Sequence, residues 1–370
     1  MAPQEEQNLA PDSTLLSQIF PNKMPPAVAA MQEIRRRVTC RRVDRLQKDC
    51  MYIAPEVPGT GTATLENGRE VAYFVSEFAL HATTLEDIVD DLSDAQISHV
   101  VSQVMGLVND LQKLNPDAEA FRAKLADIKE AQSSKPNRLK RGGLSKGWFD
   151  TPIHFFRGMF AALDTYKRCT VTETEDGGLK VESSIEGIDP VTLSKFDMDY
   201  HWATAIICHN DLEPRNILVR ERKVDGAEEI EYEVVAIIDW EMAGFYPVGF
   251  EMANKDRVLG TSNLNFRWYR EFRDQVAWLP PRAASSSAFK SPIPAFDVVV
   301  RSNVADRGTI RNAGDKIAAK WIERELLVLS DDVSKGWVRR SDAGGAKRYT
   351  RKDNQELELT VLIEMKIVPS

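Results

Sequence analysis

Three polar side chains in one short segment, Ile206–Val219, have the types and spacing that suit phosphate chemistry. His209, Asp211 and Asn216 form the pattern H-x-D-x-x-x-x-N, which lies between two short apolar runs. Further along the chain, another run of strand-forming apolar residues ends at Asp239. A loop between two strands would aim the carboxylate and the amide of the pattern at one spot, and the later strand end would add a second carboxylate. The segment is therefore a candidate catalytic loop.

Transfer of a phosphoryl group from a nucleotide to a hydroxyl group needs these residue types. One carboxylate orients the acceptor hydroxyl and takes its proton late in the reaction. An amide oxygen and a second carboxylate hold Mg²⁺ against the phosphates, because this ion prefers oxygen ligands to sulfur or imidazole. The loop and the later strand end supply this set of groups, so the sequence predicts a phosphotransferase that uses Mg²⁺.

The same residues resemble the catalytic loop of the aminoglycoside phosphotransferases, the choline kinases and related small-molecule kinases. That family has H-G-D-x-x-x-x-N followed by I-I-D-W, and here Asn210 stands at the glycine position. Ile237–Trp240 matches the second motif, and the continuation to Pro247 is similar to the fungal branch of the family. The resemblance implies a protein-kinase-like, two-lobed α/β fold with ATP as the phosphate donor.

The resemblance also implies a role for each residue of the loop. Asp211 would be the catalytic base, and His209 would be a scaffold that holds the loop in place. Asn216 and Asp239 would bind Mg²⁺. The substrate would be a small molecule with a hydroxyl group, lying between the loop and the helices of the C-terminal lobe. Independently of the resemblance, Glu213 and Arg215 are expected to form salt bridges of the loop.

Upstream, the resemblance extends to the segment that would hold the adenine base. Tyr73–Glu77 resembles the strand that leads into the hinge of this family, as part of a hinge strand at about 71–79. The resemblance implies that backbone groups of Glu77, Phe78 and Ala79 hydrogen-bond to the base.

The phosphate-binding part of the N-terminal lobe departs from the family pattern. No G-x-G-x-x-G loop precedes the first predicted helix, which begins near Ala27. Lys23 is the candidate for the lysine that contacts the phosphates, but Pro21 makes its surroundings a poor strand. Loss of this lysine would loosen the grip on the phosphates, and positioning carries most of this catalysis. Three alternatives are open: an active but divergent enzyme, an N-terminally truncated product, and a pseudokinase that binds nucleotides or partners without catalysis.

Three parts of the chain are distinguished by their patterns. A reduced N-terminal lobe is predicted over 1–80, a mostly helical catalytic lobe over 81–282, and a linker and tail of unknown role over 283–370. Within the first part, Asn67-Gly68 lies between two β-rich runs and predicts a hairpin over 60–78.

Local signals mark further elements. Ser93 with Gln96 three residues later predicts a capping box that opens an amphipathic helix. In the last part of the chain, the sequence predicts a helix near 316–329 and a strand near 357–368.

The composition narrows the classes of function. The chain has 370 residues, a formal net charge of −8 and an isoelectric point of about 5.4. Nucleic acids and membrane surfaces attract basic proteins, so neither is expected as a partner. The sequence shows no signal peptide and no apolar run of membrane-spanning length, and its four cysteines lack the spacing of metal or disulfide frameworks. These features predict a cytoplasmic protein and leave the oligomeric state open.

Overall fold

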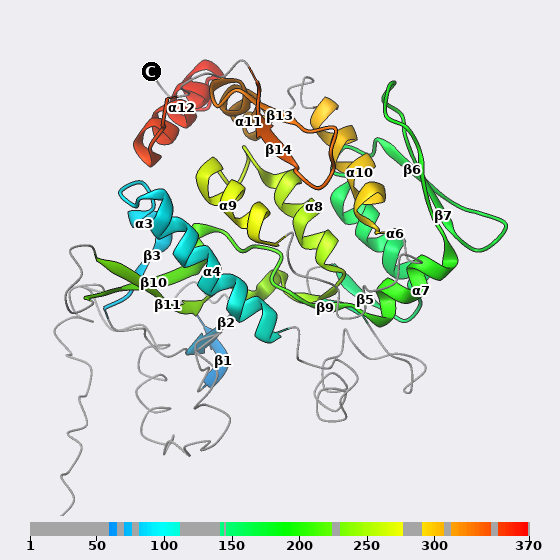
Figure 1. Cartoon of the computed structure of the whole chain (residues 1–370), viewed down its shortest axis with the longest axis horizontal. Helices are drawn as coiled ribbons and strands as arrows, with labels where there is room; N and C mark the ends of the chain where they lie inside the picture. The colour runs from blue at the N-terminus through cyan, green and yellow to red at the C-terminus, as the bar shows by residue number, and fades with distance from the viewer. Residues whose placement is uncertain are drawn as a thin grey trace, which may run out of the picture. The chain divides into compact units, whose positions relative to one another are not determined.

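A computed structural model gives the structure of the chain, which combines helices with antiparallel sheets (Figure 1). The chain forms two compact units, Met1–Leu80 and His81–Ser370. In the described part of the chain, no helix has the length and apolar character needed to cross a membrane. The described residues are 59–64, 70–75, 81–111, 141–143, 146–223, 230–276, 291–306, 312–341 and 347–368.

The described part of the first unit is a pair of antiparallel strands. Strand β1 (Gly59–Thr64) pairs with β2 (Glu70–Val75), in a register that runs from Gly59 opposite Val75 to Thr64 opposite Glu70. These are the two strands of the predicted hairpin, whose Asn67-Gly68 turn lies outside the described residues.

A three-stranded sheet in the second unit holds one side of the candidate loop. Strand β10 (Ile217–Arg222) lies between β11 (Glu231–Ile237) and the short β3 (Thr83–Thr84), and both pairings are antiparallel. Ile217 pairs with Ile237. The residue before β10 and the residues after β11 therefore lie at the same end of the sheet.

A second sheet holds the other side of the loop. It has the order β5 (Gly147–Phe149), β4 (Arg141–Gly143), β12 (Gly244–Tyr246), β9 (Ile206–Cys208). Strands β4 and β12 approach so closely that a Cβ atom at Gly244 would lie 2.3 Å from the carbonyl oxygen of Gly142. The candidate loop runs from the end of β9 to the start of β10, so each of its ends is fixed by a different sheet.

The predicted capping box is confirmed at the start of α4 (Asp94–Leu111). The Ser93 backbone N–H donates to Gln96 Oε1 at 2.8 Å, and the Gln96 N–H donates to Ser93 Oγ at 3.2 Å. Gln103 then bonds along β11, donating to the carbonyl of Tyr232 at 2.8 Å and accepting from the N–H of Val234 at 2.9 Å. This amide satisfies backbone groups at the edge of the sheet, as buried strand edges require.

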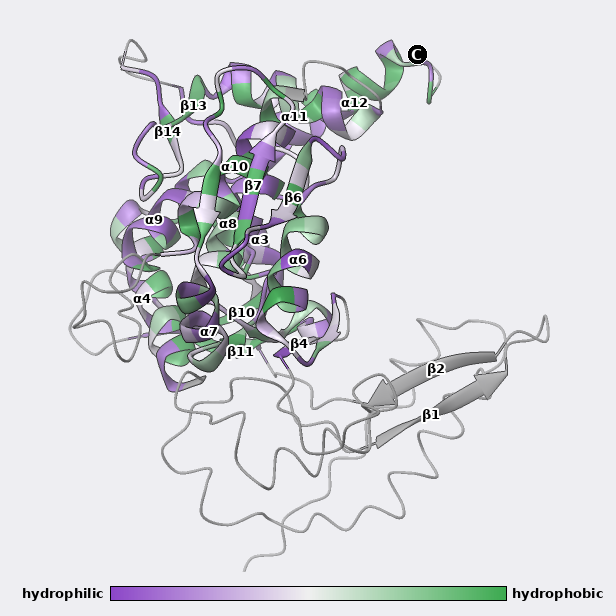
Figure 2. Cartoon of the chain, turned by 90° about the vertical axis from the view of Figure 1, so that its right-hand side faces the viewer, coloured by the Kyte–Doolittle hydropathy of each residue, from purple (hydrophilic) through white to green (hydrophobic). Residues whose placement is uncertain are grey.

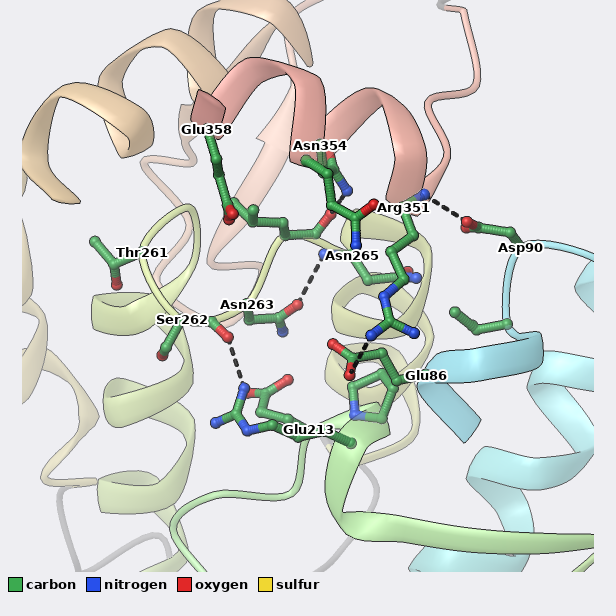
Figure 3. Close-up of a pocket in the computed structure, with 15 residues that line it drawn as sticks. Glu86, Asp90, Glu213, Thr261, Ser262, Asn263, Asn265, Arg351, Asn354 and Glu358 are labelled. Atoms are coloured by element: carbon green, nitrogen blue, oxygen red, sulfur yellow. Dashed lines mark hydrogen bonds and ion pairs between the residues drawn. The ribbon is translucent and has the colours of Figure 1, made fainter. Parts of the chain in front are cut away.

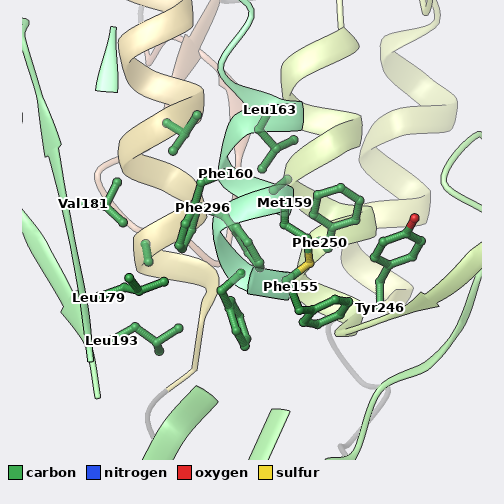
Figure 4. Close-up of a cluster of buried hydrophobic side chains, with 14 of the residues drawn as sticks. Phe155, Met159, Phe160, Leu163, Leu179, Val181, Leu193, Tyr246, Phe250 and Phe296 are labelled. Atoms are coloured by element: carbon green, nitrogen blue, oxygen red, sulfur yellow. The ribbon is translucent and has the colours of Figure 1, made fainter. Parts of the chain in front are cut away.

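The main hydrophobic core of the second unit is a cluster of buried side chains from several helices and strands (Figure 4). Helices α6 (Pro152–Leu163), α8 (Val248–Val258) and α10 (Ile293–Asp306) pack together with the sheet of β6 (Cys169–Glu173), β7 (Leu179–Ser183) and β8 (Val191–Leu193). Helix α7 (Lys195–Ala203) packs on α6, and Figure 2 shows hydrophobic and hydrophilic residues mixed along α7. Aromatic side chains fill the centre of this core: Phe155, Phe156, Phe160, Phe250 and Phe296.

Helices and strands after residue 290 belong to the same unit as the candidate loop. This region contains α10, α11 (Ala313–Arg324), β13 (Leu327–Leu329), β14 (Trp337–Arg339) and α12 (Arg351–Glu364). Trp337 is buried, and its indole N–H donates to the carbonyl of Asp256 in α8 at 2.9 Å. The stretch predicted as a linker and tail therefore contributes to the core.

The predicted strand near 357–368 is wrong, because this stretch lies mostly within helix α12. Its apolar residues alternate with polar ones, which imitates a strand. A capping box between Thr350 and Asp353 starts a helix instead, and the fully buried Val361 lies one helical turn from the partly buried Leu357. Local capping and i, i+4 packing decide the conformation here.

Candidate active site

The candidate loop begins with a residue in a left-handed conformation. Asn210, at the position where the resembled family has glycine, has a φ of 64°. Asparagine is one of the few side chains that adopt this region readily. Its Nδ2 donates to the carbonyl of Met242 at 2.9 Å, which ties the loop to the segment after β11.

Buried polar residues of α8 hold the backbone of the loop from below. Glu251 accepts the backbone N–H groups of His209 at 3.2 Å and Asn210 at 3.0 Å. Asn254 Nδ2 donates to the carbonyl of Asn210 at 2.7 Å, and Lys255 Nζ donates to that of Leu212 at 2.5 Å. All the helix groups in these bonds are buried, so the loop rests on a fixed polar surface.

Burial raises the pKa values of two carboxyl groups beneath the loop. Burial raises the pKa of Glu251 to about 7, against the opposing effect of Lys255. Glu213, whose Oε1 lies 3.0 Å from Lys255 Nζ, also has a raised pKa because of burial. The sequence analysis missed this layer, although polar residues at 251, 254 and 255 share the i, i+3, i+4 spacing of one helix face.

His209 connects the loop to β11 as a neutral ring. Its Nδ1 lies 3.2 Å from the backbone N of Asp211, and its Nε2 lies 3.0 Å from the carbonyl oxygen of Ile238. A backbone N–H can only donate and a carbonyl can only accept, so Nδ1 carries no proton and Nε2 carries one. Burial lowers the pKa of His209 to about 4, which agrees with the neutral form. The ring therefore links the backbone of the loop to the residue that follows β11.

Asp211 has a fixed carboxylate that reaches solvent. Arg215 Nη2 donates to its Oδ1 at 2.7 Å and to its Oδ2 at 2.9 Å, and Asn216 Nδ2 donates to Oδ2 at 2.8 Å. Asn216 Nδ2 also donates to the Asp211 backbone carbonyl at 2.8 Å. The side chain is 20% exposed. Since Oδ1 accepts only the bond from Arg215 among the described residues, it has room for a further donor.

Asn216 and Asp239 lie at the same end of the three-stranded sheet. The Ile238 N–H donates to the carbonyl of Asn216 at 2.9 Å, which joins the start of β10 to the end of β11. Asp239 has a left-handed backbone, with φ 65° and ψ 59°, so the chain turns there. Burial has the largest effect on the pKa of His209 and lowers it, while the charges of Asp211 and Asp239 both act to raise it.

The two predicted Mg²⁺ ligands fit the ion by chemical type. Both Nδ2 hydrogens of Asn216 are used on Asp211, so the amide oxygen is its remaining hydrogen-bonding atom. That oxygen and the Asp239 carboxylate are hard ligands of the kind Mg²⁺ takes alongside phosphate oxygens and water. Within the described ranges, no group of three or more His, Cys, Asp or Glu side chains could hold a metal on its own.

A cavity of about 250 Å³ opens beside the loop (Figure 3). Its walls come from α3 (Leu85–Ile88) and the residues after it, from Glu213–Arg215, from the segment Thr261–Asn265 and from α12. Arg215 belongs to the loop and also lines the cavity. Its Nη1 donates to the carbonyl of Ser262 in the cavity wall at 2.7 Å, while its Nη2 contacts Asp211 in the loop. Arg351 ties α12 to α3 through an ion pair with Glu86 at 3.6 Å.

Two buried polar atoms on residues that line this cavity have no hydrogen-bond partner in the described part of the chain. They are Oε2 of Glu213 and Nδ2 of Asn263, on side chains that are 1% and 4% exposed. The first needs a donor and the second needs an acceptor. Both atoms are shielded from solvent, so a ligand in the cavity would reach them only after a local rearrangement.

The remaining predicted site residues lie outside the described residues. These are Lys23, the candidate phosphate lysine, and the hinge residues Glu77, Phe78 and Ala79. By contrast, His209, Asp211 and Asn216 lie in the loop between β9 and β10, and Asp239 lies just after β11, the strand that pairs with β10. Comparisons with protein-family models, with curated proteins and with solved structures found no match for this chain.

Proposed function

We propose that this protein is a kinase-like phosphotransferase that moves the γ-phosphate of ATP to a hydroxyl group of a small molecule with the help of Mg²⁺. The observation that carries the proposal is the Asp211 carboxylate, fixed by two side chains and still partly exposed. It lies next to Asn216 and close to the end of β11, where Asp239 stands. We further propose that the chain has the two-lobed fold of such kinases and belongs with the family that its loop resembles.

In the proposed reaction Asp211 orients the acceptor. The acceptor hydroxyl donates its hydrogen bond to Oδ1, the carboxylate oxygen with the fewer bonds. As the acceptor oxygen bonds to the γ-phosphorus, the bond from that phosphorus to the β–γ bridging oxygen breaks and ADP leaves. The hydroxyl proton passes to Asp211. Fixed orientation is the main contribution the protein can make, because phosphoryl transfer proceeds largely by positioning and electrostatic stabilisation.

Asn216 and Asp239 would hold the metal in this scheme. Bound Mg²⁺ supplies positive charge against the phosphate oxygens. Asn216 is oriented for this by the two bonds that its Nδ2 gives to Asp211, which leave its oxygen as the free end of the amide. Asp239 has a left-handed backbone conformation, which changes the direction of the chain just after β11.

The cavity beside Arg215 is the proposed place of the acceptor. Arg215 lines this cavity, and its guanidinium group also contacts Asp211.

Calorimetric titration of the protein with ATP, with and without Mg²⁺, tests this function. Loss of an outer-shell partner usually weakens metal binding by about 10- to 100-fold, so loss of a direct ligand should do at least as much. We expect Asp239→Asn to weaken ATP binding by about tenfold or more in Mg²⁺ and to leave binding without Mg²⁺ unchanged.

Glu241→Gln is the matched control, because Glu241 is an exposed carboxylate two residues further along. It should leave ATP affinity unchanged. Wild-type protein that binds no ATP would contradict the proposal. Binding that is tight but insensitive to Mg²⁺ would instead favour a nucleotide-binding protein without catalysis.

A further inference from the structure

Arg215 forms more hydrogen bonds than a simple surface ion pair, because its guanidinium group contacts two separate segments of the chain. One nitrogen, Nη2, donates to both oxygens of Asp211 at 2.7 and 2.9 Å, and another, Nη1, donates to the carbonyl of Ser262 at 2.7 Å. The guanidinium thus joins the candidate catalytic carboxylate to the segment that follows α8. Its side chain is 34% exposed.

The geometry restricts how Asp211 can turn. With Arg215 on both oxygens and Asn216 Nδ2 on Oδ2, rotation of the carboxylate would break at least one charged hydrogen bond. The anchor of Arg215 on Ser262 fixes the guanidinium in turn. An exposed ion pair ordinarily contributes little to stability, about 0–1 kcal/mol. We therefore expect the contacts of Arg215 to matter more for the orientation of the Asp211 carboxylate than for the stability of the folded chain.

We propose that Arg215 is a positioning residue for the phosphotransferase reaction, holding the Asp211 carboxylate so that Oδ1 faces the acceptor hydroxyl. This inference rests on the proposed function. Lysine would not replace Arg215 fully, because a single ammonium lacks the planar fork that reaches Asp211 and Ser262 at once. Arg215 also lines the cavity, so the residue that orients the base borders the acceptor as well.

The steady-state hydrolysis of ATP in Mg²⁺, with water as the acceptor, tests the inference on the full chain. A small misplacement of a catalytic group lowers rate by about 100-fold, so Arg215→Ala should lower kcat by about 10- to 100-fold. KM for ATP should stay the same, since Arg215 bonds to Asp211 and Ser262 and not to the proposed Mg²⁺ ligands. Arg215→Lys should recover part of kcat.

Two readouts separate positioning from a merely structural effect. If Arg215 acts through Asp211, the double variant Asp211→Ala/Arg215→Ala should be no slower than Asp211→Ala alone, as expected for residues that act as a unit. Free guanidinium ion, well below denaturing concentrations, should raise kcat of Arg215→Ala and leave the double variant unchanged. Arg220→Ala is the control, because Arg220 makes an exposed ion pair with Glu233 on the neighbouring strand.

The outcomes distinguish this inference from the function on which it rests. Active wild-type protein with an Arg215→Ala variant of normal kcat would overturn the inference and leave the proposed function standing. If the losses of kcat in the two single variants add up in the double variant, the inference is likewise overturned and the proposed function is left standing. Wild-type protein that shows no Mg²⁺-dependent turnover of ATP would overturn the proposed function, and the inference with it.

Discussion

At the scale of single residues, the backbone conformation of Asn210 and Asp239 determines where the loop and the strand end point. Both have left-handed φ values, of 64° and 65°. Most side chains avoid this region by roughly 1–2 kcal/mol, whereas glycine enters it freely and Asn or Asp tolerate it. Asn210, in place of the glycine of the motif that the loop resembles, therefore preserves the left-handed backbone conformation of this position.

A pair of variants at Asn210 isolates this backbone effect. Asn210→Gly and Asn210→Ala both lose the bond to the Met242 carbonyl, so they differ mainly in their tolerance of a positive φ. We expect the alanine variant to be less stable than the glycine variant by about 1 kcal/mol in urea unfolding. Equal stabilities would mean that the loop does not hold residue 210 in this conformation.

Most of the loop at this scale could be predicted from the sequence, because its motif is local. Residues 209–216 are close in the chain, and two flanking strands suffice to bring Asn216 near Asp239. The contacts of Arg215 were foreseen only as a loop salt bridge. Its anchor on Ser262 depends on the path of the chain after α8, which no local pattern encodes.

At the scale of elements, α8 supports the loop with side chains that a globular helix usually exposes. Glu251, Asn254 and Lys255 are all buried and bonded to loop backbone. No helix was predicted over these residues, because polar groups that are buried next to the core residues Phe250 and Ala253 erase the amphipathic period. The i, i+3, i+4 spacing of the polar group was the available signal.

Burial of Glu251 makes stability depend on pH. Its pKa is raised from 4.5 to about 7, so between these values the folded chain binds more protons than the unfolded chain. This contribution to stability is fully present below pH 4.5 and is lost as pH rises through 7. His209 has the opposite sign, because its pKa is lowered from 6.5 to about 4 and its contribution is lost as pH falls through 4.

The difference between wild type and Glu251→Gln isolates the Glu251 contribution, since His209 is common to both. A pKa shift of this size corresponds to about 3 kcal/mol at most. The free energy of unfolding of wild type, minus that of the variant, should fall by about 2–3 kcal/mol between pH 5 and pH 8. Urea titrations at several pH values measure this difference. A constant difference would show that Glu251 is ionised throughout.

At the scale of the whole molecule, the second unit is larger than the predicted catalytic lobe. Residues 293–364 supply α10 to the main core and a smaller cluster around Trp321 and Trp337. The proline and serine content near 280–287 predicted a linker there, and this segment lies outside the described residues. The helices and strands after the segment are held by tertiary contacts such as that of Trp337 with Asp256, which sequence patterns do not reveal.

Trp337→Ala tests whether the C-terminal part is needed for folding of this unit. Removing a buried tryptophan side chain usually costs about 3–5 kcal/mol. The urea midpoint should fall accordingly, with one cooperative transition. Val328→Ala is the control, because Val328 lies on the partner strand β13 and is 44% exposed. An unchanged midpoint for Trp337→Ala would mean that the C-terminal elements fold apart from the loop.

The proposed reaction requires Asp211 as the catalytic base. Its most direct test is the Mg²⁺-dependent release of phosphate from ATP by wild type and by Asp211→Ala, with circular dichroism to verify the fold. We predict turnover by wild type and a loss of about 100- to 10,000-fold in the variant, the range typical of a lost general base. Equal turnover by two folded proteins would contradict the catalytic role of Asp211.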